Sequence, residues 1–276
     1  MRREEIERIE IGLLLEAIYQ RYGYDFRSYS QASIERRIRQ FLSGNGYKNI
    51  SEIIPKLLHD EKFLSNMIQY FSISVTEMFR DPFVYSAIRK QVVPFLKTYP
   101  HIKIWHAGCA TGEEVYSLAI VLKEEGMLER TTIYATDFND ASLEKAKAGI
   151  FSADKIKEAT HNYQYSDGTD SFSEYYHARY DAAAIDNSLK KRITFANHNL
   201  ATDSVFVETH LIFCRNVLIY FNRDLQNRAL GLFADSLVRG GFLCLGTKET
   251  LNFTAVSELF DAVDGKAKIY RKKMPK

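Results

Sequence analysis

Cysteine is scarce in this sequence, and the few cysteines form no framework. The 276 residues include three, Cys109, Cys214 and Cys244, which are widely separated and make no C-x-x-C pair. Disulfide scaffolds and zinc sites need cysteines in pairs at short spacings. We therefore expect a reducing, cytoplasmic location, with neither disulfides nor bound zinc.

Long apolar runs and a strong net charge are absent as well. No apolar run reaches the length of a membrane-spanning helix, and the N-terminus mixes acidic with basic residues and shows no signal-peptide cleavage site. The formal net charge of +2 argues against nucleic acid as the main partner. Metal-ligand spacing is missing among the histidines His161, His177, His198 and His210. We expect a globular protein with no direct membrane insertion, no nucleic-acid partner and no metal.

Apolar residues are plentiful and patterned. At 46% of the chain they can fill a sizeable core, in one large or two smaller domains. Over residues 1–71 they recur at helical spacing, in groups separated by turn residues such as Gly23 and Gly46. This pattern predicts a small all-helical N-terminal domain.

One segment of this domain, SIERRIRQFL, sets a basic face beside an apolar stripe. The basic residues are Arg36, Arg37 and Arg39. One interpretation is an ordinary solvated helix face, and the other is a docking face for an acidic protein partner.

Residues 72–100 separate the helical domain from the rest of the chain. Their first part, SISVTEMFRDP, contains apolar residues, hydroxyls and one arginine instead of flexible filler, so we expect an ordered linker. Pro82 either begins the next helix or ends the preceding segment. Taken alone, Arg80 would be a surface ion-pair partner.

The most informative segment is IKIWHAGCATGEEVYS, which ends at Ser117. Its apolar run predicts a buried strand, which is followed by a glycine-flanked turn and a helix. Gly108 and Gly112 allow backbone angles and close approaches that a side chain would block, and the helix start offers free N–H groups. Such a turn is where a fold places a nucleotide-like ligand.

A second apolar strand, residues 132–136, ends in Asp137. A helix follows at about residues 141–148, with Asn139 or Asp140 as its N-cap. Strand, glycine turn, helix, strand and acid form the first half of a doubly wound α/β sheet. Asp137 is either a turn or capping residue or an acceptor for both ribose hydroxyls, and the glycine turn favours the ribose.

The turn separates two adenosine cofactors. Dinucleotide binders, such as nicotinamide dehydrogenases, favour G-x-G-x-x-G, whereas only Gly108 and Gly112 are present here. Glu113 and Glu114 would repel a diphosphate but could hold the ammonium of an amino-acid tail, although pairing with the helix dipole also explains them. S-adenosylmethionine has such a tail and no phosphate, so it is the favoured cofactor.

Between residues 149 and 192 the alternation of strand and helix is lost. Short β-prone pieces lie around Tyr175, Tyr176, Tyr180 and Ile193. They predict a small antiparallel β insert at about residues 163–195.

Six blocks of this sequence resemble the CheR family, the chemoreceptor glutamate O-methyltransferases that use S-adenosylmethionine. The blocks are TEMFRDP, AGCATGEEVYSLAI, ATDFNDASLEKAKAGIF, FANHNL, IFCRNVLIYF and GGFLCLGTKETL. They cover almost the whole chain and follow the family's order. A chance match of six blocks is far less expected than a chance match to one glycine turn. The resemblance implies a doubly wound, Rossmann-like methyltransferase domain over residues 101–276, behind the helical domain.

The resemblance also implies the roles of individual residues. The implied cofactor-binding residues are Ser74, Thr76, Arg80, Glu114 with Glu113 as second choice, Asp137, Asn199, Leu200, Asn216 and Val217. Ser74 stands where the family has an asparagine, and its hydroxyl keeps one hydrogen bond but has a shorter reach. Arg80 and Tyr220 are implied at the reaction centre.

The residue types agree with carboxylate methylation. Methyl transfer from a sulfonium is an in-line displacement, and an ionised carboxylate needs no general base. Sites that methylate amines often carry Asn/Asp-Pro-Pro-Tyr after the fourth strand, but the segment here, residues 215–218, has no proline. Arg80 and Tyr220 can both donate to a carboxylate and orient it.

The expected activity is methylation of glutamates in methyl-accepting chemotaxis receptors, giving methyl esters and S-adenosylhomocysteine. The face with Arg36, Arg37 and Arg39 would meet the acidic helical region of the receptor, and the insert is suited to docking a receptor C-terminal peptide by strand addition. We expect a monomer. The alternative is a module that senses S-adenosylmethionine or its product without turnover, which the change at Ser74 permits.

Overall fold

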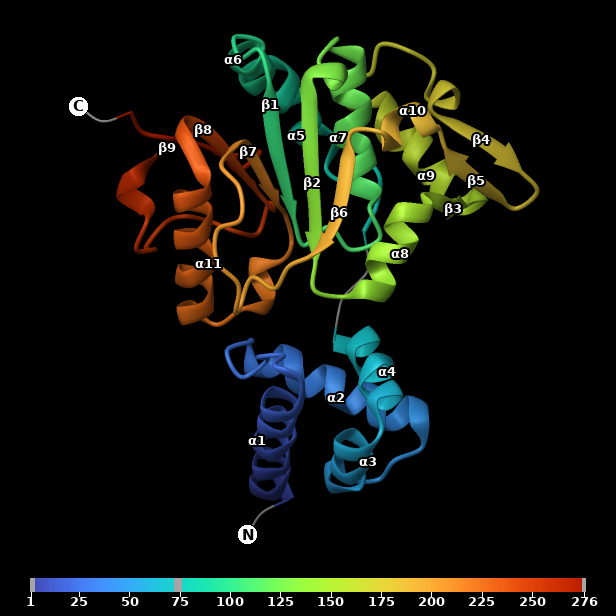
Figure 1. Ribbon diagram of the computed structural model, residues 1–276, viewed down its shortest axis with the longest axis vertical. Helices are drawn as coiled ribbons and strands as arrows, with labels where there is room; N and C mark the ends of the chain where they lie inside the picture. Colours follow the sequence, from blue (N-terminus) through green and yellow to red (C-terminus); the bar gives the residue numbers. More distant parts are fainter. Residues whose placement is uncertain (1–2, 72–75, 275–276) are drawn as a thin grey trace.

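The computed structural model describes residues 3–71 and 76–274 (Figure 1). Its N-terminal domain is built from helices, which confirms the prediction from apolar spacing. These helices are α1 (Arg3–Tyr22), α2 (Gln31–Asn45), α3 (Ile54–His59) and α4 (Glu61–Phe71). Side chains from all of them, among them Leu14, Ile38, Leu57 and Met67, are buried in one apolar cluster.

The rest of the chain folds around a seven-stranded sheet, in the order β6-β2-β1-β7-β8-β10-β9. Neighbouring strands from β6 to β8 are parallel, and β10 is antiparallel to both β8 and β9. The strands are β1 (Ile102–Ala107), β2 (Thr131–Asp137), β6 (Ile193–Asn197), β7 (Thr209–Cys214), β8 (Leu237–Leu245), β9 (Phe260–Asp264) and β10 (Ile269–Lys272). The order reverses between β1 and β7, which is the doubly wound arrangement that the sequence predicted.

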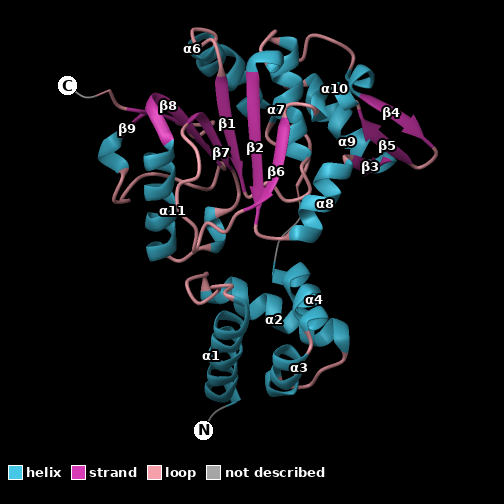
Figure 2. Cartoon of the chain, viewed as in Figure 1, coloured by secondary structure: helices cyan, strands magenta, loops and turns pink. Residues whose placement is uncertain are grey.

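Helices cover both faces of this sheet because its central strands are apolar on both sides (Figure 2). Along β7, Leu211 and Phe213 join the core with α7, whereas Ile212 and Cys214 join the core with α11. α5 (Pro82–Ala87) continues through a π-helical turn (Ile88–Val92) into α6 (Val93–Leu96). The other helices are α7 (Glu113–Glu124), α8 (Asp140–Ala148), α9 (Ala153–Gln164), α10 (Asn187–Lys190) and α11 (Arg223–Ser236). Pro82 therefore begins a helix, the first of the two alternatives that the sequence allowed.

A second, three-stranded antiparallel sheet lies beside α9 (Figure 1). It has the order β3-β5-β4, from β3 (Ile150–Ser152), β5 (Ala182–Ile185) and β4 (Tyr176–Arg179). The predicted insert differs from it at both ends. β3 precedes the predicted start, and Ile193 begins β6, which pairs in parallel with β2 in the main sheet. β6 is a short edge strand with few buried residues, so its sequence does not distinguish the two sheets.

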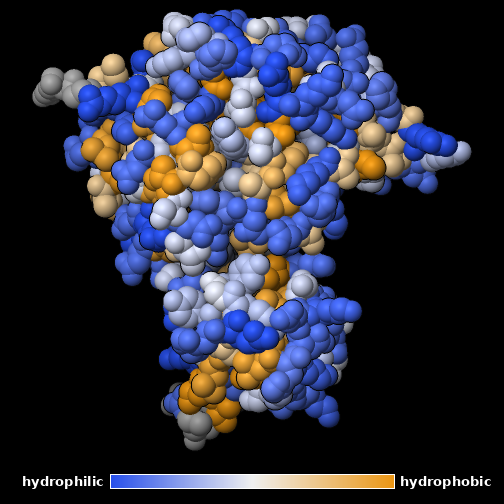
Figure 3. Space-filling model, viewed as in Figure 1, coloured by the Kyte–Doolittle hydropathy of each residue, from blue (hydrophilic) through white to orange (hydrophobic). Residues whose placement is uncertain are grey.

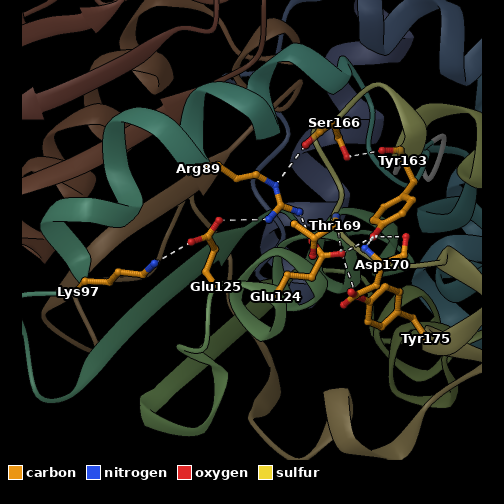
Figure 4. A network of polar contacts seen from close by, with 9 residues as sticks. All are labelled: Arg89, Lys97, Glu124, Glu125, Tyr163, Ser166, Thr169, Asp170 and Tyr175. Atoms are coloured by element: carbon orange, nitrogen blue, oxygen red, sulfur yellow. Dashed lines mark hydrogen bonds and ion pairs between the residues drawn. The ribbon is translucent and has the colours of Figure 1, made fainter.

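A buried polar network joins α7 to α9 and to the segment that precedes β4 (Figure 4). Glu124, whose side chain is 0% exposed, forms an ion pair with Arg89 of the π-helical turn. The same carboxylate accepts hydrogen bonds from the hydroxyls of Tyr163 and Tyr175, the latter at 2.8 Å. Because a buried carboxylate without partners is costly, the network holds α9 and the residue that precedes β4 in place against α7.

On the face shown in Figure 3, an apolar area lies at the end of the helical domain where α1 begins. Its large exposed side chains are Ile6, Ile9 and Leu13 of α1. Within the described residues, no helix has both the length and the apolar composition needed to cross a bilayer.

Candidate active site

A cleft lies at the carboxyl ends of β1, β2 and β7, and its lining comes from both the sheet domain and the helical domain. Ligands of doubly wound folds bind at this edge, beside the point where the strand order reverses. The space inside it, including the part open to solvent, is about 1000 Å³. Its lining combines residues from both domains: Tyr29, Ser33, Ile34, Arg37, Phe71, Thr76, Arg80, Gly108, Cys109, Ala110, Glu114, Asp137, Phe138, His198, Asn199, Leu200, Arg215, Asn216, Val217, Tyr220 and Phe221.

The glycine turn after β1 forms the floor of the cleft. Gly108 has φ +71°, and a Cβ there would lie 2.5 Å from a methyl carbon of Val217. Gly112 has φ +90° and is the N-cap of α7. The turn is tied to β2, because the amides of Gly108 and Cys109 both donate to the Thr136 carbonyl, at 2.8 and 2.9 Å. A Cβ at position 108 would clash with Val217, so only glycine there allows the loop after β7 to pack this closely against the turn.

Asp137 lies at the end of β2, inside the cleft, and is only 8% exposed. One carboxylate oxygen accepts from the amide of Ala110 and the other from the amide of Asn139, both at 2.9 Å. Burial raises the pKa of Asp137, and the amide donors oppose that rise without cancelling it. Each oxygen has a further lone pair, which a ligand hydroxyl can use. Asn139 is the cap of α8, one of the two predicted candidates.

The two glutamates that begin α7 point to different places. Glu114 lines the cleft, whereas Glu113 lies outside its lining. Glu113 accepts from the Thr111 hydroxyl at 2.6 Å and pairs with Lys155. Of the two residues that could hold an ammonium group, only Glu114 is therefore placed to do so.

Glu114 has a partner that the sequence analysis did not find. Arg215, whose side chain is fully buried, pairs with Glu114 and donates to the Arg80 carbonyl at 3.0 Å. It also pairs with Asp81 at 2.5 Å. Burial raises the pKa of Glu114, and Arg215 and then Arg80 act against that rise. An arginine directly after a buried strand was the available signal, because such a charge requires a partner.

Arg80 is held in a strained turn. Its neighbours Phe79 and Asp81 both have left-handed backbones, with φ +53° and +54°. The Phe79 amide donates to the Ser117 hydroxyl at 2.8 Å, and Arg215 donates to the Arg80 carbonyl. Both contacts hold the turn in place. Left-handed non-glycine residues tend to cluster at functional sites, where surrounding contacts maintain them.

The loop after β7 forms the opposite wall. Asn216 is left-handed, with φ +59°, and its buried Oδ1 has no hydrogen-bond partner among the residues that the structure describes. Tyr220 is half-buried, which raises the pKa of its phenol, while Arg37, Arg80 and Arg36 act in the other direction. Arg36 and Arg37 of the helical domain and Arg80 of the following segment therefore act electrostatically on the Tyr220 phenol.

The helical domain supplies an aromatic part of the cleft that the sequence analysis missed. Tyr29 lies edge-on to Phe221, with ring centroids 5.0 Å apart, and Phe138 lies 5.8 Å from Phe26. The backbone joins the two domains as well, since the Ser30 amide donates to the Tyr220 carbonyl at 2.8 Å. Aromatic residues at domain contacts provide both apolar area and specific ring geometry.

Most other predicted residues also reach the cleft. Thr76, Asn199, Leu200 and Val217 line it, and Ser74 lies outside the described residues. The three arginines of α2 separate. Arg37 lines the cleft, Arg36 is exposed, and Arg39 pairs with Glu7 at 2.7 Å without lining it.

The hydrogen-bond acceptors that line the cleft fit S-adenosylmethionine. Asp137 suits a ribose, and Glu114 suits an ammonium group. The unsatisfied Asn216 Oδ1 is a further acceptor for a polar ligand atom, since a buried polar atom without a partner is costly. In the described part of the chain, no cluster of three metal-ligating side chains is found.

Comparison with known proteins gives the same cofactor. The family description "CheR methyltransferase, SAM binding domain" matches residues 74–269, and "CheR methyltransferase, all-alpha domain" matches residues 9–72. Cher3 of Pseudomonas putida, named as a methyltransferase, is 54% identical over 264 residues, covering 96% of this chain and 97% of that protein. A protein of Listeria innocua named chemotaxis protein methyltransferase is 33% identical over 231 residues, covering 83% and 85%.

Proposed function

The chain belongs to the CheR methyltransferase family and binds S-adenosylmethionine, and on this basis we propose that it methylates glutamate side chains of chemoreceptors. The products would be glutamate methyl esters and S-adenosylhomocysteine. One observation carries the proposal: the cleft combines acidic groups for the cofactor with Arg80 and Tyr220, which can receive a carboxylate. The name chemotaxis protein methyltransferase, given to relatives such as the Listeria protein, supports the receptor as substrate.

In this proposal the cofactor is held along the strand ends. Asp137 accepts from the ribose hydroxyls, and Glu114 and Asn216 hold the amino-acid tail. Asn199, Leu200 and Val217 enclose the remaining surface, and Thr76 contacts the cofactor from the linker. The cofactor supplies an electrophilic methyl group on a sulfonium.

The protein's part in the reaction is orientation and exclusion of water. An ionised glutamate is already a nucleophile, so the site has to align it in line with the methyl group. We propose that Arg80 and Tyr220 donate to the carboxylate oxygen that does not attack. Tyr29, Phe71 and Phe221 would shield the reacting atoms from water.

The receptor is proposed to approach over α2. Arg37 stands at the cleft, and Arg36 and Arg39 extend the basic face outward, where acidic residues of a helical receptor would meet them. The small sheet offers a second contact, because β4 is its edge strand and can pair with a peptide. The protein would act in the cytoplasm, as a monomer.

A labelled-methyl experiment tests the proposed function. The chain is incubated with methyl-labelled S-adenosylmethionine and cytoplasmic receptor fragments from its own source. We expect label in the fragment that base releases as methanol, which is the behaviour of a methyl ester. Tight cofactor binding without transfer to any fragment would instead support a sensor, and base-stable label would indicate another acceptor.

Removing the charge of Asp137 should weaken cofactor binding. We expect Asp137→Asn to raise the Kd for S-adenosylmethionine by about 10- to 100-fold, because hydrogen bonds to a charged group are lost. Calorimetry measures the Kd. Asp186→Asn is the matched control, since Asp186 likewise accepts from a backbone amide, that of Ser188 at 2.8 Å, but lies outside the cleft lining. Equal affinities for the two variants would contradict the ribose role.

A further inference from the structure

Glu249 lies behind the wall of the cleft and lines no part of it. It follows β8, is 5% exposed, and its carboxylate binds the backbone of the neighbouring loop. Its Oε2 accepts from the amides of Gly246 at 2.6 Å and Asn216 at 3.1 Å, and its Oε1 accepts from the amide of Ile219 at 3.2 Å. One side chain therefore ties the end of β8 to two points of the loop after β7.

The partners of Glu249 are unusual for a buried carboxylate. Among the residues that the structure describes, no lysine, arginine or histidine forms an ion pair with it. Burial raises its pKa, and the amide donors of the two loops oppose that rise. Backbone N–H groups thus stabilise the charge, and in return the charge fixes the backbone.

The turn that Glu249 holds, residues 216–220, carries three cleft residues: Asn216, Val217 and Tyr220. Asn216 has a left-handed backbone, a conformation that is strained for a non-glycine residue and persists only where other contacts maintain it. The bond from its own amide to Glu249 is such a contact. Without it, the backbone at Asn216 would be free to relax, and Tyr220 would move with it.

We propose that Glu249 is a positioning residue for methyl transfer. It holds turn 216–220 in the geometry that brings the Asn216 side chain to the cofactor and the Tyr220 hydroxyl to the acceptor carboxylate, and it touches neither substrate. The inference rests on the proposed function, which supplies the reaction that the turn serves.

A comparison of two buried carboxylates tests the proposal. Glu249→Gln keeps the size of the side chain but replaces one carboxylate oxygen, which accepts hydrogen bonds, by an NH2 group. That group is a donor, and it would face the backbone N–H groups that the carboxylate now binds. Glu124→Gln does the same in the network of Figure 4, which lies outside the cleft lining. For each variant, kcat and KM for methyl transfer, the Kd for S-adenosylmethionine and the melting temperature are measured on the full chain.

We expect Glu249→Gln to lower kcat by about 100-fold, the effect of displacing a reacting group by roughly 1 Å. Its cofactor Kd should rise, with a smaller change in the KM for the receptor fragment. Glu124→Gln should lower the melting temperature and leave the kcat of the folded protein unchanged. If Glu249→Gln loses activity only in proportion to its loss of folded protein, Glu249 is merely structural and the proposal is overturned.

Hydrogen exchange gives a test that depends on neither folding of a variant nor turnover. In the unmutated chain, the amides of Asn216 and Ile219 should exchange slowly, because Glu249 accepts from both. Fast exchange at both positions would overturn the proposal. If no receptor fragment is methylated, the proposed function fails, but the exchange and cofactor-binding results still decide whether Glu249 holds the turn.

Discussion

Replacement of Arg215 by methionine should cost about 3–5 kcal/mol of the free energy of unfolding, the usual effect of breaking a buried ion pair. The variant leaves Glu114 in the core without its cation and releases both Asp81 and the Arg80 carbonyl. Turnover should also fall below detection, because Arg80 and Glu114 lose their common support. Chemical denaturation and the methyl-transfer assay measure the two losses.

The stability loss should depend on pH. Burial already raises the pKa of Glu114, and removal of Arg215 takes away the charge that opposes the rise most. A carboxyl whose pKa is higher in the folded than in the unfolded chain binds more protons when folded, so stability falls as pH rises through that interval. The difference between Arg215→Met and the parent should therefore be smaller at about pH 5 than at about pH 8.

Two further variants test whether these losses come from the ion pair between Arg215 and Glu114 or from the loss of any buried arginine. Adding Glu114→Gln to Arg215→Met removes the uncompensated charge and should recover part of the stability but none of the activity. Arg89→Met removes another buried arginine, which pairs with Glu124 away from the cleft. It should destabilise the fold and leave turnover of the folded protein intact. A stable, active Arg215→Met variant would show that the arginine is dispensable.

The parts of the site that residue patterns predicted without the family resemblance are those fixed by local structure. Gly108, Gly112 and Asp137 belong to one strand-turn-helix-strand unit, whose backbone requirements are visible within about 30 residues. The same holds for the Asn139 cap and for the apolar periodicity of the helical domain. In each case a short segment determines its own geometry.

The parts that the sequence analysis missed depend on contacts between distant segments. Arg215 meets Glu114 across 101 positions, and Glu249 binds a loop 33 positions away. The aromatic wall around Tyr29 forms only because the helical domain docks beside Phe221. Sheet assembly decides such pairings, so a single sequence gives only the weak signal of a charge next to a buried strand.

Dependence on distant contacts also explains why the predicted β insert differs from the three-stranded sheet that forms. Ile193 begins a strand with exposed positions, and such a strand can close a hairpin or extend the edge of a larger sheet. Which of these it does depends on whether β2 has a free edge beside it. β6 fills that edge, in parallel register from Ile193 opposite Ile133.

Replacement of Arg80 by alanine should lower kcat by about 100- to 1000-fold, which is typical for loss of a group that stabilises charge in a transition state. The Kd for S-adenosylmethionine should change by no more than a few-fold, because Glu114 keeps its main partner, Arg215. Single-turnover methyl transfer gives the rate, and calorimetry gives the Kd. Arg192→Ala is the matched control, since Arg192 pairs with Glu129 on the surface.

Replacement of Arg80 by lysine distinguishes a contribution from the positive charge of Arg80 from a contribution of its guanidinium geometry. Arg80→Lys keeps the positive charge but loses the planar fork that can bind one carboxylate through two N–H groups. If charge balance beside Glu114 is the main contribution, the lysine variant should recover most of the rate. If orientation of the acceptor is the main contribution, it should stay near the alanine variant, and the strained turn at Phe79 and Asp81 then serves to aim the guanidinium. An alanine variant with unchanged kcat would remove Arg80 from the reaction centre altogether.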